Sequence, residues 1–347
     1  MAISAQELTE AIQDIKHIQA NLSDEYRESV AKSIRDSQIN RKSIYEKSWN
    51  TKVASIDSMV ASGKDFGAIV RELIKPVPRS GLLSPAINRN VLNIDLGDFE
   101  YTPGQKLCAF DGRYRQIDEN YMDFRLIDCL KDCLAPDVDC VVEFGAGWGK
   151  NLSLLLIGSG RSDVEFIACE PSSSGRYCFE KLFSQLAGVK FSSQPFDFSD
   201  PKMDMIGERK HVLAFTSAAI EQVVFLPRSF MKGLLNLAEK VTLVFYEPIG
   251  WQRSMDHFNR VFSTVLDEYG GKSVPGAYKN GYVFKFSDEY FLDNSSSWAI
   301  LSKYNINLLN ILNNVVNEEK AALLGVHYDI YSSNPLNPYS LFILEKK

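Results

Sequence analysis

The sequence predicts an α/β protein in which helices cover a mostly parallel sheet and a helical region precedes it. Three observations lead to this prediction. From about residue 120, strand-like and helix-like stretches alternate regularly, which is typical of parallel strands joined by helical crossovers. Residues 1–75 carry apolar positions at helical spacing among many charges. Two strand-like stretches, 326–333 and 339–346, are joined by the turn NPLNP near the end of the sequence and predict an antiparallel hairpin.

The expected elements of the sheet domain follow one another in order. Strands are expected at 140–145, 164–170, 189–198, 211–217 and 241–248, before the final hairpin. Helices are expected at 119–134, 151–160, 173–187, 228–239 and 305–324. We therefore divide the chain into a helical N-terminal region at 1–75, a linker or cofactor-flanking segment at 76–119, and a sheet domain at 120–347. The sheet domain includes an aromatic-rich insertion at about 250–302.

Composition excludes several classes of protein. Of the 347 residues, 45% are hydrophobic and 24% are charged, as in average soluble globular proteins. No apolar run approaches the roughly 20 residues that a membrane span needs, and the N-terminus is polar, so we expect a cytoplasmic protein without a membrane partner. The net charge of −6 makes a nucleic-acid partner an unfavoured interpretation.

The cysteines do not indicate a metal site. Cys129 and Cys133 stand four residues apart on an expected helix, and two thiolates at that spacing could share a metal. The four histidines are not spaced to complete such a site. Buried, reduced thiols are the favoured interpretation, and we predict no metal.

The stretch VVEFGAGWGKNL, from Val141 to Leu152, indicates a strand that enters a tight glycine-rich turn and then a helix. Three kinds of nucleotide-binding loop share this outline. A P-loop needs an opening glycine and a Lys-Ser/Thr pair, but Phe144 and Asn151 stand at the glycine and hydroxyl positions. A dinucleotide loop needs G-x-G-x-x-G, but Lys150 stands at its last glycine. A nicotinamide dehydrogenase is therefore disfavoured.

The third kind of loop fits. Acid-x-Gly-x-Gly-x-Gly at the end of a first strand resembles motif I of the class I S-adenosylmethionine-dependent methyltransferases. The resemblance covers about 120–347 and implies a Rossmann-like seven-stranded sheet, parallel with an antiparallel last strand. It also implies S-adenosylmethionine as the cofactor. The residues that it implies beside the methionine moiety are Glu143, Gly145, Ala146 and Gly147.

Two more acids stand where this resemblance implies them. Glu170 ends the second strand, 21 residues after Gly149, where a carboxylate can accept hydrogen bonds from both ribose hydroxyls. The alternative is an acid that only caps the following helix. Asp197, with Phe198 beside it, follows the third strand and is expected at the adenine. Three further residues are expected near the cofactor: Arg115, Asn151 and Thr216.

Methyl transfer requires a positioned nucleophile and, for a hydroxyl acceptor, a group that takes its proton. The resemblance to class I methyltransferases implies that such groups stand at the carboxyl ends of the fourth and fifth strands. The candidate catalytic residues are Glu221, Glu247 and His257. The end of the fourth strand carries Thr-Ser-Ala-Ala, not the Asn/Asp-Pro-Pro-aromatic motif of amino-methylating enzymes. We therefore expect O-methylation of a small-molecule or sugar hydroxyl, with the insertion at about 250–302 covering the acceptor.

The sequence is also compatible with two other functions. The enzyme could methylate a protein or peptide that docks on the N-terminal helices. Alternatively, the chain could be a non-catalytic, methyltransferase-like scaffold that binds a nucleoside ligand or a partner.

Overall fold

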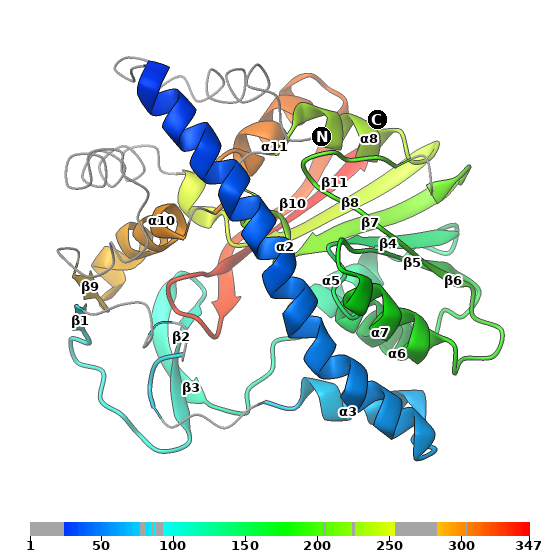
Figure 1. Ribbon diagram of the computed structural model, residues 1–347. Helices are drawn as coiled ribbons and strands as arrows, with labels where there is room; N and C mark the ends of the chain where they lie inside the picture. The colour runs from blue at the N-terminus through cyan, green and yellow to red at the C-terminus, as the bar shows by residue number, and fades with distance from the viewer. Residues whose placement is uncertain are drawn as a thin grey trace.

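The computed structural model describes residues 24–76, 81–84, 87, 93–203, 206–223, 226–253, 283–302 and 304–347 (Figure 1). Of residues 24–42 and 300–301 it describes the backbone alone. The central feature is a mixed sheet whose order is β3-β2-β10-β11-β8-β7-β4-β5-β6. Seven of its strands form the sheet predicted from the sequence: β4 (Cys140–Phe144), β5 (Glu165–Cys169), β6 (Phe191–Gln194), β7 (His211–Ser217), β8 (Lys240–Glu247), β10 (Ala321–Ser332) and β11 (Tyr339–Lys346).

The directions of these seven strands confirm the predicted fold class. Strands β6, β5, β4, β7 and β8 are paired in parallel. Strand β11 lies antiparallel between β8 and β10. In chain order the sheet reads 3-2-1-4-5-7-6, a parallel sheet with an antiparallel last strand, as the resemblance to class I methyltransferases implies.

Two additional strands extend the sheet beyond β10. They are β2 (Gln105–Phe110) and β3 (Arg113–Asp118), and both lie in the segment that the sequence analysis assigned to a linker. They are joined by Asp111 and Gly112, both with positive φ (47° and 72°), which is a two-residue hairpin turn. Strand β2 pairs with β10 at Tyr331 and Ser332. A separate small sheet pairs β1 (Ile94–Asp95) with β9 (Phe284–Lys285).

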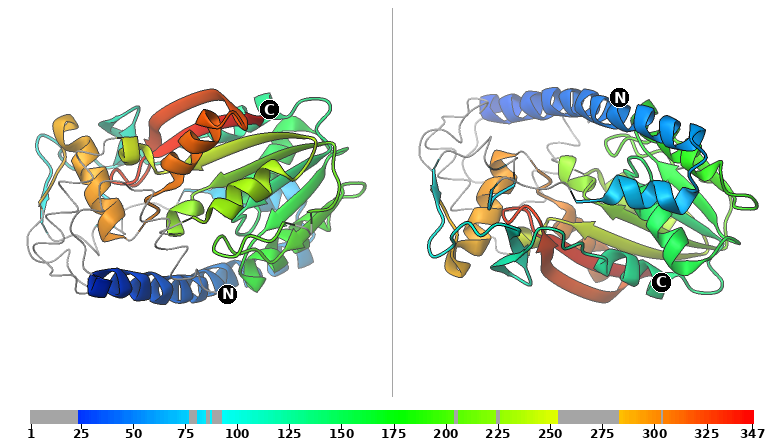
Figure 2. Two further views of the ribbon diagram at one scale, coloured as in Figure 1. Left: turned by 90° about the horizontal axis from the view of Figure 1, so that it is seen from above. Right: turned by 90° about the horizontal axis from the view of Figure 1, so that it is seen from below.

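Helices cover both faces of the central sheet, as Figure 2 shows. Successive residues of a strand point to opposite faces, so Val141 joins one hydrophobic cluster and Val142 the other. The first cluster includes α3 (Phe66–Ile74), α5 (Arg125–Cys133), α6 (Lys150–Ser159) and α7 (Ser173–Phe183). The second includes α8 (Arg228–Leu235) and α11 (Leu308–Asn317). A third cluster lies around β2, β3 and α10 (Phe291–Leu301).

The last helix, α11, is shorter than the sequence predicted. We expected a helix at 305–324, but α11 ends at Asn317 and β10 begins at Ala321. Glu319 adopts a positive φ of 57°, and the amide of Lys320 donates back to the carbonyl of Val315, which closes the last turn. Cross-strand pairing with β11 therefore overrides the helical spacing of the residues after this turn.

A long helix, α2 (Asp24–Ala61), crosses the side of the molecule on which α7 lies (Figure 1). Glu46 of α2 accepts hydrogen bonds from the amides of Ser173 and Ser174 and from the hydroxyl of Ser173, at the start of α7. Desolvation opposes ionisation of Glu46, but these hydrogen bonds outweigh it and lower the pKa of the carboxyl. A carboxylate is also favoured at a helix N-terminus by the helix dipole.

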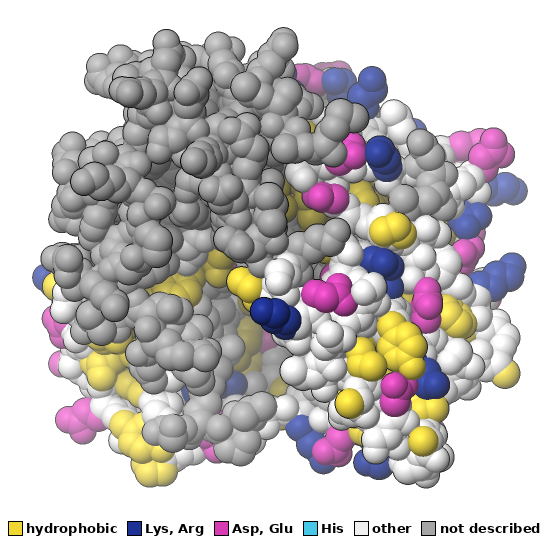
Figure 3. All heavy atoms as spheres, in the orientation of Figure 1, with side chains coloured by type: hydrophobic (Ala, Val, Ile, Leu, Met, Phe, Trp, Pro, Cys, Tyr) yellow, Lys and Arg dark blue, Asp and Glu magenta, His cyan; other side chains and the backbone are white. Residues whose placement is uncertain are grey.

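The surface visible in Figure 3 carries acidic and basic side chains that are interspersed, outside the grey atoms. That part of the face therefore has no continuous basic patch of the kind that binds nucleic-acid phosphates. Within the described ranges, no helix combines the length and the apolar character needed to cross a membrane.

We predict that Gly149→Ala destabilises the protein more than Gly188→Ala does. Both glycines have a φ near 80°, which costs an L residue about 1–2 kcal/mol. A Cβ at Gly149 would also lie 2.4 Å from Cδ2 of the buried Phe179, whereas a Cβ at Gly188 would meet nothing within 4 Å. Overpacking should add about 1–3 kcal/mol to the loss at Gly149. Urea unfolding measures both, and equal losses would contradict the packing argument.

Candidate functional site

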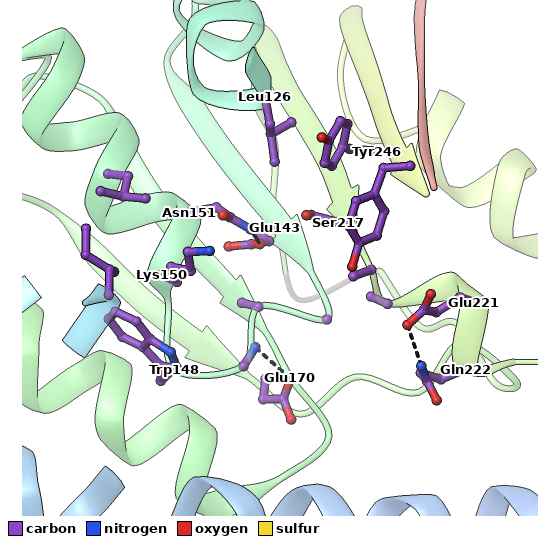
Figure 4. Close-up of a pocket in the computed structure, with 18 of the residues that line it drawn as sticks. Leu126, Glu143, Trp148, Lys150, Asn151, Glu170, Ser217, Glu221, Gln222 and Tyr246 are labelled. Carbon is purple, nitrogen blue, oxygen red and sulfur yellow. Dashed lines mark hydrogen bonds between the residues drawn. The ribbon is translucent and has the colours of Figure 1, made fainter. Parts of the chain in front are cut away.

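A cavity of about 1100 Å³ opens at the carboxyl ends of β4, β5 and β7, where ligands bind in open α/β sheets. Its volume slightly exceeds the roughly 300–1,000 Å³ typical of small-molecule sites. The glycine-rich loop between β4 and α6 forms part of the wall (Figure 4). Eight of the ten predicted cofactor residues line this cavity: Glu143, Gly145, Ala146, Gly147, Asn151, Glu170, Asp197 and Phe198.

Glu143, at the end of β4, is almost fully buried, with 1% of its surface exposed. Its Oε1 accepts a hydrogen bond of 2.7 Å from Nδ2 of Asn151. Its Oε2 is buried and has no hydrogen-bond partner among the described residues. Burial raises the pKa of the Glu143 carboxyl to about 8, although Asn151 and the nearby Lys150 act in the opposite direction. Burying an acceptor without a donor costs free energy. This oxygen is therefore a candidate acceptor for a hydrogen bond from a molecule bound in the cavity.

Glu170, directly after β5, holds the glycine loop. Its Oε2 accepts from the amide of Gly147 at 2.8 Å, and its Oε1 accepts from the amide and the hydroxyl of Ser172 at 3.0 and 2.6 Å. Burial raises the pKa of this carboxyl. Ser172 in turn caps α7 by accepting from the amide of Gly175. A carboxylate offers about four acceptor positions, so Glu170 both supports the start of α7 and keeps an acceptor position for a ligand.

Asp197 and Phe198 lie in the loop after β6. The Oδ1 of Asp197 accepts from the amide and the hydroxyl of Ser199, at 2.9 and 2.5 Å. Phe198 is buried and packs against Phe196 and Phe230 with ring centroids 5.1 and 5.4 Å apart. The loop is thereby anchored by an aromatic cluster while Asp197 stays exposed at the cavity wall.

Two predicted cofactor residues do not line this cavity. Arg115 lies on β3, with 46% of its side chain exposed and Asp288 as an ion-pair partner at 3.9 Å. The strand order places β3 three positions beyond β11, away from the glycine loop on β4. Thr216, with 1% of its surface exposed, is buried and does not line the cavity. Because side chains alternate along a strand, the next residue, Ser217, reaches the cavity instead.

Glu247, at the end of β8, is fully buried and is not a cavity-lining residue. Its carboxylate accepts from the amides of Ala219, Ile220 and Glu221, at distances between 3.1 and 3.3 Å. Burial, followed by the charge of Glu221, raises its pKa to about 8. This geometry makes Glu247 the support of the turn after β7, and its side chain is not part of the cavity wall.

Of the two candidate catalytic residues that the structure describes, Glu221 lines the cavity and Glu247 does not. Glu221 belongs to the short helix Ile220–Gln222 after β7 and is 7% exposed. Its carboxylate accepts from Nε2 of Gln222 at 2.6 Å and from Nδ2 of Asn337 at 2.9 Å. The third candidate, His257, lies outside the described residues, as do five of the eleven aromatic residues of the predicted cover.

The cavity also contains groups that the sequence analysis did not assign. Tyr246, on β8, donates to Oδ2 of Asp123 at 2.8 Å, and Asp123 pairs with Arg125 at 2.7 Å. Tyr246 also stacks on Tyr339, with ring centroids 5.0 Å apart. No local sequence pattern indicated that Asp123 lines the cavity, because its position there depends on a contact with Tyr246, which is far along the chain. Trp49 and Tyr45 of α2 line the cavity as well, and their i,i+4 spacing was a usable signal for one helical face.

Cys129 and Cys133 are free, half-buried thiols. Across the ranges that the structure covers, no group of three or more His, Cys, Asp or Glu side chains could hold a metal ion.

Comparisons with known proteins give remote structural similarities. No family model and no curated protein matches the chain. Among solved structures, EvdMO1 matches at 14% identity with a TM-score of 0.36, over 72% of this chain and 43% of that one. The chain thus spans less than half of EvdMO1. Magnesium protoporphyrin IX methyltransferase from Synechocystis PCC 6803 with bound SAH matches at 14% identity, TM-score 0.34, over 64% and 83%. The O-methyltransferase from Bacillus cereus in complex with SAH matches at 9% identity, TM-score 0.38, over 65% and 83%.

We predict that the contribution of Glu143 to stability falls as the pH rises from about 4.5 to 8. The pKa of Glu143 is raised to about 8 in the folded chain, from an ordinary value of 4.5. Across this window the unfolded chain binds fewer protons at this position than the folded chain does. The stabilisation is therefore complete below pH 4.5 and is lost as the pH rises through 8. Urea unfolding over a pH series should show a shallower fall for Glu143→Gln than for the wild type. An identical fall would show that Glu143 is ionised in the folded protein.

Proposed function

We propose that this protein is an S-adenosylmethionine-dependent methyltransferase that methylates a hydroxyl group of a small molecule or sugar. The observation that carries the proposal is the convergence of Glu143, Glu170 and Asp197 on one cavity, from the ends of three neighbouring parallel strands. When bound, S-adenosylmethionine supplies an electrophilic methyl group on a sulfonium centre. Since it carries no phosphates, carboxylates and glycine amides suit it better than a phosphate-binding loop does.

The residues of the cavity fit this cofactor in chemistry and in order. The unpartnered Oε2 of Glu143 is suited to accept from the ammonium group of the amino acid tail. Glu170 keeps an acceptor position for a ribose hydroxyl while its other positions hold Gly147 and Ser172. Asp197 is suited to accept from the adenine amino group, and Phe198 offers an apolar neighbour for the base.

The acceptor would enter beside β7 and β8, where the wall carries Ser217, Glu221 and Tyr246. Glu221 is our candidate for the group that takes the proton of the acceptor hydroxyl, because its carboxylate reaches the cavity and is oriented by Gln222 and Asn337. Tyrosine rings on this side of the cavity could stack against a sugar ring or a flat ligand. We propose that Glu247 positions Glu221 by holding the three amides of its turn.

The described part of α2 does not favour the alternative in which a peptide acceptor docks on the N-terminal helices. Its face with Tyr45, Trp49 and Ile56 is directed into the cavity and the core. Assays of turnover distinguish an enzyme from the other alternative, a non-catalytic scaffold that only binds a ligand.

We predict that S-adenosylhomocysteine binds the protein at least about 100-fold more tightly than NAD or ATP, a difference of roughly 2.7 kcal/mol. The cavity offers carboxylates to an ammonium and a ribose but no P-loop or dinucleotide motif for phosphates. Titration calorimetry with the three ligands measures the affinities. Tight NAD binding without any response to S-adenosylhomocysteine would overturn the proposal.

We predict that Glu221→Gln lowers turnover by about 10²–10⁴-fold, the usual contribution of a positioned base, while S-adenosylhomocysteine affinity stays within about twofold. The amide keeps the shape of the side chain but cannot take a proton. The measurement requires an acceptor, which a mass-spectrometric screen of hydroxylated metabolites, glycans and peptides for the gain of one methylene group would identify. Normal turnover by the variant would exclude Glu221 as the base. Failure of every acceptor class, with tight cofactor binding, would favour the non-catalytic scaffold.

A further inference from the structure

Helix α2 contributes an aromatic face to the cavity. Tyr45 and Trp49 lie one turn apart on this helix, and both line the cavity beside the glycine loop. The two rings are roughly parallel, with centroids 6.3 Å apart. The ring of Trp49 packs directly on the backbone of Gly147, since a Cβ added at Gly147 would lie 2.8 Å from Cζ2 of Trp49. The loop that carries motif I is therefore covered by a residue almost 100 positions earlier in the chain.

The polar end of Trp49 has no acceptor within the described part of the chain. Its Nε1 is buried and makes no hydrogen bond there. An indole N–H that is buried normally finds a partner, because an unsatisfied donor loses its hydrogen bonds to water without replacement. Glu143 presents the complementary case in the same cavity, an acceptor oxygen without a donor. One buried donor and one buried acceptor, from two elements that face the same space, indicate a ligand that offers both kinds of group.

The position of Trp49 is fixed by contacts on both sides of it. One turn before it, Glu46 binds the start of α7 through three hydrogen bonds, and its carbonyl accepts a fourth from the hydroxyl of Ser174. Two turns after it, Asp57 accepts from the hydroxyl of Tyr177 at 2.9 Å. Ile56 is fully buried in the core between these contacts. The helix is thus docked on α7, and the indole is held against the loop.

We propose that α2 is part of the cofactor site and that Trp49 is a cofactor-binding residue, which donates its indole N–H to an oxygen of S-adenosylmethionine. This inference rests on the proposed function. Motif I, Glu170 and Asp197 bind the cofactor from the sheet, and Trp49 binds it from the opposite side. Binding of the cofactor then strengthens the docking of α2 on α7, because the same residue belongs to both contacts.

The test compares two Trp→Phe variants by calorimetry with S-adenosylhomocysteine. Trp49→Phe keeps an aromatic ring but removes the N–H, and we expect the affinity to fall about tenfold. Trp298→Phe makes the same change in a separate hydrophobic cluster, away from the cavity wall, and we expect unchanged affinity. Hydrogen exchange of residues 43–61 provides a second readout, with slower exchange expected when S-adenosylhomocysteine is added to the wild type.

The possible outcomes distinguish a failure of the role of Trp49 from a failure of the proposed methyltransferase function. If the wild type does not bind S-adenosylhomocysteine, the proposed function fails. If the wild type binds but Trp49→Phe binds equally well and the exchange of residues 43–61 is unchanged, the role of Trp49 and α2 is wrong while the function stands. Should Trp49→Phe fail to fold, Glu46→Gln tests the same coupling, since weaker docking of α2 should weaken binding. Unchanged binding by Glu46→Gln would overturn the coupling.

Discussion

The hydrogen bond from the amide of Gly147 to the carboxylate of Glu170 is the interaction on which the cavity depends. It joins the glycine loop after β4 to the end of β5, the strand that pairs with β4 in parallel. Through Ser172 the same carboxylate reaches the start of α7, and through Glu46 that start is bound to α2. Trp49 of α2 then returns to Gly147. The contacts form a closed ring, so each member limits the movement of the others.

Glu143 and Glu247 show that two equally buried carboxylates can differ in how fully the protein satisfies their hydrogen-bonding capacity. Both are almost inaccessible, both end strands of the same sheet, and burial raises the pKa of each to about 8. Glu247 is surrounded by three backbone amides, so its acceptor positions are used within the protein. Glu143 has one oxygen satisfied by Asn151 and one without a partner. The difference lies in hydrogen bonding, which a strand-end acid in a sequence does not reveal.

The parts of the fold that the sequence predicts well are those encoded by local pattern. The glycine turn, the alternation of strands and helices, and the acids at 143, 170 and 197 follow from short-range spacing, and the structure brings them to one cavity. The parts that it does not predict depend on distant partners. Strands β2 and β3 need β10 to become part of the sheet, and the residues after Asn317 leave the helix because β11 offers them a pairing edge. Arg115 follows β3 to the far edge of the sheet for the same reason.

The place of β2 beside β10 has a consequence for how the chain folds. Phe110 pairs with Tyr331, so more than half of the chain separates two residues that are direct neighbours in the sheet. Pairings between such distant segments form slowly, because the intervening chain must lose its freedom before the contact is made. Strands β2 and β3 therefore form a hairpin that is only marginally stable by itself until β10 pairs with its edge. Completion of this sheet edge therefore requires a segment more than 200 residues away from β2 along the chain.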